Sequence, residues 1–247
     1  LIVFPFIGIM ADQEPKRAFT PSGSYSMGLF ESGDSVDVTA DITGTSDFTF
    51  MTWAYPTTAN QYIFKTSDNT AFLQVKSDGK LRFQVYGGTT AVDYNATTAL
   101  TASQWNSVAV VSTGSAIILY LNGAVDAIVS GTGESWFDNF TNNTNRIGIG
   151  AYVGSTPVYM NGKIMQVAYW GGSSGTTGVL DGDAIAALHA AGKGYDIKGS
   201  GDTGNYDSWS ADLKGYWRMG NHYLDSAGNT SIYDASGYGT DMVGVSI

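Results

Sequence analysis

Carboxylate, amide and aromatic side chains gather between residues 134 and 159, where their types could recognise a ligand. The apolar faces of sugar rings stack on aromatic planes, while sugar hydroxyls need fixed hydrogen-bond donors and acceptors. Trp136 and Phe137 are consecutive, so one of the two would face outward on a strand. The sequence therefore predicts a carbohydrate-binding surface made by Glu134, Trp136, Asp138, Asn139, Tyr152 and Tyr159. The alternative interpretation is that Trp136 anchors a loop over the edge of the core.

Residue patterns that would support catalysis are missing. Glycoside hydrolysis needs two carboxylates that flank the scissile bond. The densest acidic run has spacings of three, three and four, which would scatter the side chains over both faces of a strand: Glu31, Asp34, Asp37 and Asp41. We expect His189 to be a surface or packing residue of a helix and His222 to lie in a loop. We predict that the protein is not an enzyme, and an unusual glucanase would need a cleft that brings distant carboxylates together.

Composition excludes several classes of protein. The chain has 247 residues and no Cys, which excludes disulfide frameworks, thiolate zinc sites and Cys nucleophiles. Its 22 acidic against 12 basic residues give a net charge of −10, which would repel a phosphate backbone, so no nucleic-acid partner is expected. The longest apolar run, residues 1–10, is interrupted by Pro5 and is too short to span a bilayer.

The pattern of elements is typical of an all-β protein. With 32 Gly, 15 Tyr and far more Asp than Glu, the composition favours turns and strands over helices. Residues 77–80 and the Asn122-Gly123 pair predict hairpin turns, because Gly and Asn tolerate the left-handed backbone that such turns need. One helix is expected over residues 181–192, with an Asp near its start and a Gly at its end. Four tryptophans lie in strand-like segments and are expected in the core: Trp53, Trp105, Trp170 and Trp217.

Several segments stand in a fixed order along most of the chain. They are residues 29–38, 47–53, 77–83, 104–109, 119–123, 146–148 and 162–164, followed by the helix at 183–191. This series resembles the laminin-G-like, concanavalin A-like lectin/glucanase family. The resemblance implies an antiparallel jelly-roll β-sandwich with one short helix. The Glu-x-Asp-x-x-Glu strand that the glucanase branch of this fold carries has no counterpart in the sequence.

Calcium is the cofactor that the residue types and the resemblance suggest. Calcium prefers carboxylate, amide and carbonyl oxygens, in which this chain is rich. Related modules often hold a structural ion near the loop that corresponds to Asp34, and Asp234 begins a second acidic turn. The competing interpretation is that each Asp caps its own turn through nearby backbone amides.

The C-terminal part departs from the usual order of the family. Residues 213–220 and 234–239 resemble the sequence segments with which family members commonly begin, yet here they follow the helix. The C-terminal segment, residues 212–247, has only thirty-six residues and cannot easily bury a core alone. We therefore expect it to add strands to the same sandwich. The predicted organisation is an apolar arm and linker (1–18), a laminin-G-like sandwich (19–192), and a Gly-rich connection with C-terminal strands (193–247).

The resemblance also suggests a setting for the protein. A Trp-Arg-Met-Gly segment after a laminin-G-like module resembles virion proteins of tailed phages. We expect a non-catalytic virion surface protein, a capsid decoration or fibre module that binds cell-surface glycans. Its apolar arm would contact other virion proteins or copies of the same chain. The alternative is a secreted, extracellular bacterial adhesin or carbohydrate-binding module.

Overall fold

The computed structural model describes residues 35–38, 47–66, 71–87, 90–113, 116–130, 147–150, 160–171, 178–198, 205–206, 212–224, 230–234, 236 and 242–246. The strands are β1 (Ser35–Val38), β2 (Asp47–Pro56), β3 (Gln61–Thr66), β4 (Ala71–Val75), β5 (Lys80–Gly87), β6 (Thr90–Ala99), β7 (Asn106–Thr113), β8 (Ala116–Leu121), β9 (Ala124–Ser130), β10 (Ile147–Ile149), β11 (Gly162–Gly171), β12 (Leu213–Leu224), β13 (Thr230–Asp234) and β14 (Met242–Ser246). The helix α1 spans Gly182–Ala191. No helix within these ranges is long and apolar enough to cross a membrane.

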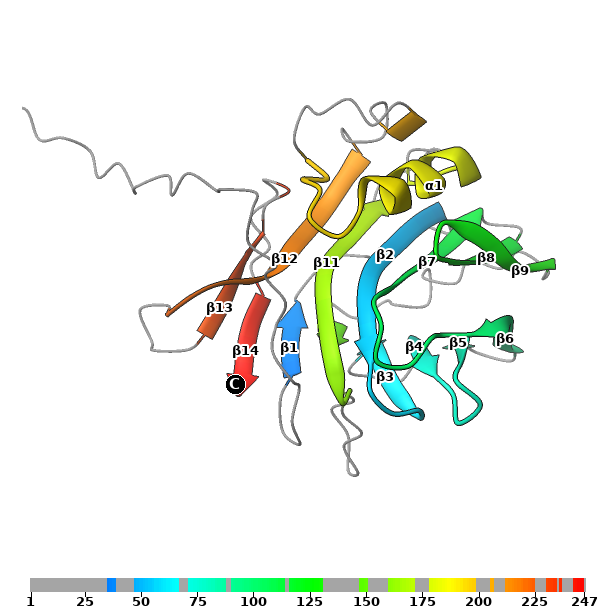
Figure 1. The fold of residues 1–247 in the computed structure, drawn as a ribbon, viewed down its shortest axis with the longest axis horizontal. Helices are drawn as coiled ribbons and strands as arrows, with labels where there is room; N and C mark the ends of the chain where they lie inside the picture. The colour runs from blue at the N-terminus through cyan, green and yellow to red at the C-terminus, as the bar shows by residue number, and fades with distance from the viewer. Residues whose placement is uncertain are drawn as a thin grey trace, which may run out of the picture.

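Hydrogen bonding joins all the strands in one continuous order, β6-β5-β4-β3-β10-β1-β14-β13-β12-β11-β2-β7-β8-β9. Every pairing is antiparallel. The order folds over on itself, so that β4–β6 lie opposite β7–β9 (Figure 1), and its two end strands, β6 and β9, come into contact. The prediction of an antiparallel β-sandwich with one short helix is confirmed.

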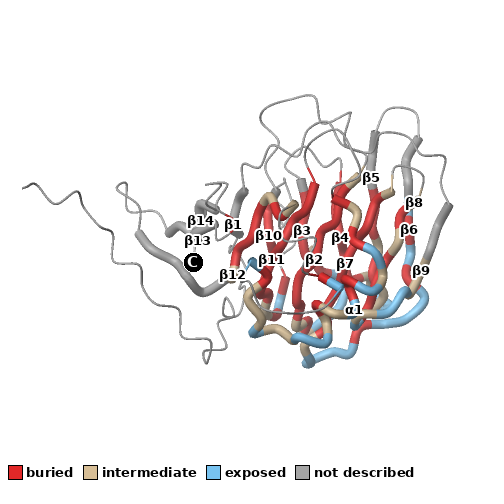
Figure 2. The backbone as a smooth tube through the Cα atoms, turned by 90° about the horizontal axis from the view of Figure 1, so that it is seen from above, coloured by how far each residue is buried: buried red, intermediate tan, exposed pale blue. Residues whose placement is uncertain are grey.

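The main core lies between the two layers. It joins side chains from β3–β6, such as Leu73 and Phe83, to side chains from the opposite layer, such as Phe50 and Val110. In Figure 2 the buried residues run along β2, β3, β4, β7 and β11. Strands that are buried on both faces carry continuous apolar runs, which explains why β2 and β7 show no simple alternation.

A second core lies on the other face of β2, β7, β11 and β12, where α1 packs. The carboxylate of Asp181 accepts a hydrogen bond from the Ala184 backbone N–H at 2.8 Å and so caps the helix. The helix buries Ile185 and Leu188 against this face, and it ends at Gly192, whose φ of 83° suits glycine. The sequence signals of residues 181–192 therefore place the helix correctly.

The C-terminal strands belong to the same sheet. β12 pairs with β11, β13 with β12, and β14 with both β13 and β1. Trp217 of β12 enters the main core, while Tyr216 and Leu213 enter the second core. His222 also lies within β12, opposite Ile232, although the sequence suggested a loop there.

The hairpin between β8 and β9 turns at Asn122 and Gly123, whose φ angles are 51° and 80°. Both values are positive, as a tight turn of type I′ requires, so the predicted hairpin is confirmed. The Asn122 side-chain oxygen accepts a hydrogen bond of 3.0 Å from the Ser107 backbone N–H. A Cβ atom at Gly123 would lie 2.8 Å from the Cβ of His189, which leaves it no space.

We expect Gly123→Ala to lower the free energy of unfolding by about 1–3 kcal/mol, because the left-handed backbone and the contact with His189 both disfavour a side chain. Urea unfolding measures this loss. Gly192→Ala isolates the backbone term, since Gly192 has positive φ but no atom within 4 Å of an added Cβ. Gly194→Ala, with open space and no positive φ, should change stability little. Equal losses at Gly123 and Gly194 would contradict the prediction.

Candidate functional site

The site residues that the sequence predicted fall largely outside the described residues. This holds for Asp34 and for all six members of the predicted carbohydrate-binding surface: Glu134, Trp136, Asp138, Asn139, Tyr152 and Tyr159. Asp234 ends β13 with its backbone opposite Trp217, and its side chain is not described. Within the described ranges, no three His, Cys, Asp or Glu side chains gather as metal ligands would. The surface at 134–159 and the calcium ion remain predictions.

The described part of the chain offers another candidate, the face of β3–β6 that points away from the main core. In two rows across four strands it carries Tyr62, Gln74, Arg82 and Asn95, and then Lys65, Phe72, Gln84 and Asp93. We call these eight side chains the β3–β6 outer face. The core-facing partners on the same strands include Leu73, Leu81 and Phe83, which are fully buried. Period-two alternation along the strands thus separates the two sets.

A bulge in β3 sets the spacing between Tyr62 and Lys65, the two members of the outer face that this strand contributes. The register shifts between Tyr62 and Phe64, and both Ile63 and Phe64 point into the main core. Tyr62 and Lys65 therefore share the outer face although they are three residues apart. A bulge of this kind re-aims the side chains that follow it.

Two aromatic rings lie at the centre of the outer face. Tyr62 and Phe72 meet edge to face, with ring centroids 5.3 Å apart and planes at 88°. Phe72 is only 4% exposed, whereas Tyr62 is half-buried and keeps part of its surface in contact with solvent. The Lys65 Nζ lies over both rings, at 5.0 Å from the Tyr62 centroid and 5.6 Å from the Phe72 centroid.

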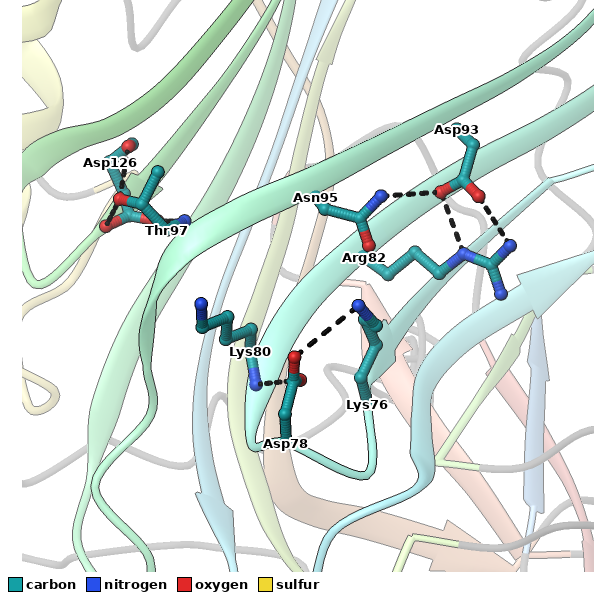
Figure 3. Close-up of polar contacts among 8 residues, drawn as sticks. All are labelled: Lys76, Asp78, Lys80, Arg82, Asp93, Asn95, Thr97 and Asp126. Carbon is teal, nitrogen blue, oxygen red and sulfur yellow. Dashed lines mark hydrogen bonds and ion pairs between the residues drawn. The ribbon is translucent and has the colours of Figure 1, made fainter.

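Charged and amide groups surround these rings. The Arg82 guanidinium donates to Asp93 twice, from Nε to Oδ1 at 2.8 Å and from Nη2 to Oδ2 at 2.6 Å (Figure 3). The Asn95 amide adds a hydrogen bond of 3.1 Å to Asp93 Oδ1. The hydrogen bond from Arg82 is the largest cause that holds the pKa of Asp93 below its ordinary value. Asp93 is therefore a fixed carboxylate at neutral pH.

Two glutamine amides complete the outer face. The Gln74 amide nitrogen donates to the side-chain oxygen of Asn60 at 3.0 Å. The Gln84 residue is 5% exposed, and its side-chain carbonyl oxygen has no hydrogen-bond partner among the described residues. A buried amide oxygen that accepts no hydrogen bond carries a desolvation cost.

Basic side chains outnumber acidic ones along β3–β6. Among the described residues from 61 to 99 there are four basic side chains, Lys65, Lys76, Lys80 and Arg82, and two acidic ones, Asp78 and Asp93. Asp78 lies in the β4–β5 turn, where its carboxylate accepts from the Lys80 backbone N–H at 3.1 Å and lies 3.5 Å from Lys76 Nζ (Figure 3). Burial lowers the pKa of Lys65 to about 8. The described part of β3–β6 thus has a small excess of basic side chains, although the chain has a net charge of −10.

Asp126 of β9 links the two layers beside this face. Its carboxylate accepts a hydrogen bond from the backbone N–H of Thr97 at 2.7 Å (Figure 3). It also accepts one from the backbone N–H of Thr98 at 3.1 Å. The Thr97 hydroxyl donates to the same carboxylate at 3.0 Å. Burial acts to raise the pKa of Asp126, but the hydrogen bonds from Thr98 and Thr97 outweigh it and leave the pKa lowered. This carboxylate is a structural link between β6 and β9.

A second aromatic pair lies elsewhere on the molecule. Tyr55 of β2 and Trp105 before β7 have ring centroids 5.6 Å apart, and Lys163 Nζ of β11 lies 5.6 Å from the Tyr55 centroid. All three side chains are half-buried. Trp105 packs at the margin of the main core. The other three tryptophans that were predicted to be in the core are buried, Trp53 and Trp217 in the main core and Trp170 in the second core. This pair has the same kinds of groups as the outer face and serves as a control for it.

His189 is a half-buried packing residue of α1, which agrees with the surface or packing role that the sequence predicted. Its ring stacks on Trp53, with centroids 5.4 Å apart and planes at 20°, and its Nδ1 lies 2.8 Å from the Ser107 hydroxyl. Burial lowers the pKa of His189. Because Ser107 is only 2% exposed, this Ser–His contact presents no nucleophile at the surface.

Several solved structures share the fold of this chain at low sequence identity. A putative carbohydrate binding protein from Bacteroides ovatus superposes with a TM-score of 0.62 at 18% identity, over 90% of this chain and 58% of that one. The CBM40 module of the Ruminococcus gnavus IT-sialidase, bound to α2,3-sialyllactose, gives 0.52 at 14% identity over 68% and 100%. A heptameric SAP-like pentraxin from Limulus polyphemus gives 0.50 at 16% identity over 66% and 80%. At these identities the likeness is one of fold.

The sequence itself carries the family signal. No curated protein matches this chain. Residues 30–176 match the model of one family, and that span is more than half of the chain. Both the residue series seen in the sequence and the sandwich seen in the structure agree with it. The chain belongs to the concanavalin A-like lectin/glucanases superfamily.

Proposed function

We propose that the chain is a non-catalytic glycan-binding module and that the β3–β6 outer face holds the sugar. The observation that supports this most is the crossed pair of Tyr62 and Phe72 within a surround of amide and charged side chains. Such a face offers both an aromatic surface for a sugar ring and fixed groups for its hydroxyls. The half-buried ring of Tyr62 is the part of the pair that a sugar can reach.

The similar structures support the same class of ligand. One of them is a putative carbohydrate binding protein, and another is a carbohydrate-binding module with bound α2,3-sialyllactose. We carry over only the ligand class, because one fold supports many functions.

The carboxylates near this face are suited to structure rather than to acid catalysis. The pKa values of Asp78, Asp93 and Asp126 are all lowered by the hydrogen bonds that they accept. A general acid of a glycosidase needs the opposite, a carboxyl group with a raised pKa. These three residues support a module that binds a sugar without cutting it.

The setting in which the module acts is part of the proposal. The virion surface remains our expectation, on the basis of the Trp-Arg-Met-Gly segment that ends at Gly220 and of the apolar arm at residues 1–10. The secreted adhesin or carbohydrate-binding module remains the alternative. A glycan-binding face serves either setting in the same way, by attaching its carrier to a cell surface.

Tyr62→Ala is expected to weaken glycan binding at least about tenfold, because it removes the accessible ring of the pair. The full chain is first screened on a glycan array, and the affinity for the best ligand is then measured by calorimetry. Tyr62→Phe keeps the ring and should keep most of the affinity. Tyr55→Ala removes a ring from the second aromatic pair and is the matched control. Thermal melting of each variant shows whether the fold is intact.

The outcomes separate the possible sites. Loss of binding in Tyr62→Ala, with normal binding in Tyr55→Ala, supports the outer face. Loss in Trp136→Ala with normal binding in Tyr62→Ala would move the site to the surface that the sequence predicted at residues 134–159. An array on which the full chain binds no glycan would overturn the proposed function.

A further inference from the structure

We infer that the β3–β6 outer face takes a linear oligosaccharide, which crosses the strands from the Tyr62 ring on β3 to the Asp93 and Asn95 side chains on β6. The inference rests on the proposed function and names the length and the direction of the ligand at the same site. It follows from the register of the four strands, from the exposure of the outer-face residues and from the hydrogen bonds that fix Asp93.

One row of the outer face runs straight across four strands. Tyr62 of β3 pairs with Gln74 of β4. Gln74 pairs with Arg82 of β5, which in turn pairs with Asn95 of β6. Neighbouring strands lie about 4.8 Å apart, so three spacings separate Tyr62 from Asn95 by about 14 Å. A single sugar ring covers only part of that length, so a ligand that contacts both ends needs at least about three linked sugars.

Both ends of this row are accessible, whereas most of the second row is shielded from solvent. Tyr62 is half-buried, and Asn95 is exposed. In the second row Lys65, Phe72 and Gln84 are buried, and only Asp93, at the β6 end, is exposed. A ligand can therefore lie along the first row and reach Asp93 at its far end.

The middle of the row needs no hydrogen bond from the ligand. The Gln74 residue is buried, and its amide nitrogen already donates to Asn60. The Arg82 side chain is 28% exposed, and its guanidinium donates to Asp93. A middle sugar unit can pack over Arg82, while the two ends of the row supply the specific contacts.

The β6 end is suited to sugar hydroxyls. Asp93 Oδ1 accepts from Arg82 Nε and from the Asn95 amide, while Oδ2 accepts from Arg82 Nη2 (Figure 3). Each carboxylate oxygen can accept two hydrogen bonds, so Oδ2 can accept one more from a sugar hydroxyl. The exposed Asn95 amide has a second N–H and a carbonyl oxygen, which suit a neighbouring hydroxyl.

Arg82 holds the Asp93 carboxylate in place before a ligand binds. The hydrogen bond from Arg82 is the largest cause that lowers the pKa of Asp93, so this group is an acceptor at neutral pH. Its side chain is nevertheless 41% exposed, which leaves a hydroxyl room to approach. Because the side chain is already ordered, binding costs little further loss of its freedom.

Neutral oligosaccharides of increasing length test the inference with the full chain. Three series, of β1,4-linked glucose, mannose and N-acetylglucosamine, run from the monosaccharide to the pentasaccharide and are titrated by calorimetry. In the series that binds best, we expect the trisaccharide to bind at least about tenfold more tightly than the monosaccharide. Longer members should gain little more, because both ends of the row are then occupied.

Asp93→Ala and Asn95→Ala each remove hydrogen-bonding groups from the β6 end and leave the Tyr62 ring in place. We expect each variant to lose most of the gain between the monosaccharide and the trisaccharide, while its affinity for the monosaccharide stays unchanged. Retained monosaccharide binding also shows that the variant is folded. Gln104→Ala is the matched control, because Gln104 is an exposed amide beside Trp105 of the second aromatic pair, and it should keep the full gain.

The failure of this inference differs from the failure of the proposed function. Equal affinities for all members of a series that binds would overturn the oligosaccharide claim and leave glycan binding intact. A length gain that survives in both Asp93→Ala and Asn95→Ala, or that Gln104→Ala also removes, would overturn it as well. Binding of none of the three series by a chain that binds another glycan on the array would overturn the inference alone. An array without any bound glycan would overturn both.

Discussion

A chain that ends at residue 211 is expected not to fold. The deletion removes β12, β13 and β14, which stand between β1 and β11 in the order of the sheet. It leaves one edge of β1 and one edge of β11 without their partners, and unpaired strand edges promote aggregation. Far-UV circular dichroism and light scattering of the truncated chain measure the effect.

Trp217 is the largest single contribution that the deletion removes from the main core. Its side chain is 3% exposed, and its ring lies over Gly215 so closely that a Cβ atom at that glycine would overlap it. Trp217→Ala should lower the free energy of unfolding by about 3–5 kcal/mol. Because whole domains are stable by only about 5–15 kcal/mol, this one change removes much of the total.

Urea unfolding of Trp217→Ala checks the same claim in a chain of full length. Val125→Ala is the control, since Val125 is 49% exposed on β9 and its truncation should cost little. A truncated chain that melts cooperatively near the midpoint of the full chain would show that the C-terminal strands are dispensable. The same conclusion would follow if Trp217→Ala and Val125→Ala were equally stable.

The role of β12–β14 shows which parts of the fold the sequence could reveal. The β8–β9 turn and the cap of α1 depend on residues within four positions of each other, so Asn122-Gly123 and Asp181 were sufficient signals. The expectation that residues 213–220 return to the sandwich came from the shortness of the C-terminal segment, which could not bury a core alone. Their position beside β11 depends on contacts between residues about fifty positions apart, which no local pattern encodes.

The outer face was missed for a related reason. Its members are spread from Tyr62 to Asn95 over four strands, so no short window of sequence shows them together. The alternation of Phe72 with Gln74, or of Asp93 with Asn95, shows that each pair shares one face of a strand. Only the register between strands brings these pairs side by side.

The bulge in β3 is a second reason why the sequence did not predict the outer face. Strict alternation from Tyr62 would place Phe64, and not Lys65, on the outer face. The structure instead buries Ile63 and Phe64 together. Sequence reasoning favoured residues 134–159 because their aromatic, acidic and amide residues are contiguous, a signal that needs no register.

Asp126→Asn is expected to destabilise the protein at neutral pH by about 1.5–3 kcal/mol, the usual range for hydrogen bonds to a charged group. The loss arises at the contact of β6 with β9, where the carboxylate accepts hydrogen bonds from Thr97 and Thr98. Asparagine keeps one oxygen acceptor but loses the charge and the second oxygen. Urea unfolding at pH 7 measures the difference, and Asp183→Asn, an exposed change on α1, is the control.

The same carboxylate should make stability depend on pH in acid. The folded pKa of Asp126 is lower than the ordinary value of 3.8, so the folded state favours the charged form. Its contribution is therefore fully present above the unfolded pKa and is lost as the pH falls through the folded pKa, below 3.8. Asp93, whose pKa is also lowered, adds a loss of the same sign.

Comparison of the unmodified chain with the Asp126→Asn variant isolates the contribution of Asp126 to the pH dependence of stability. Between pH 7 and pH 3 the free energy of unfolding of the unmodified chain should fall more than that of Asp126→Asn, because the variant has no carboxyl group to protonate. The gap between the two chains should narrow as the pH decreases. A gap that stays constant down to pH 3 would mean that Asp126 holds β6 against β9 through its shape and not through its charge.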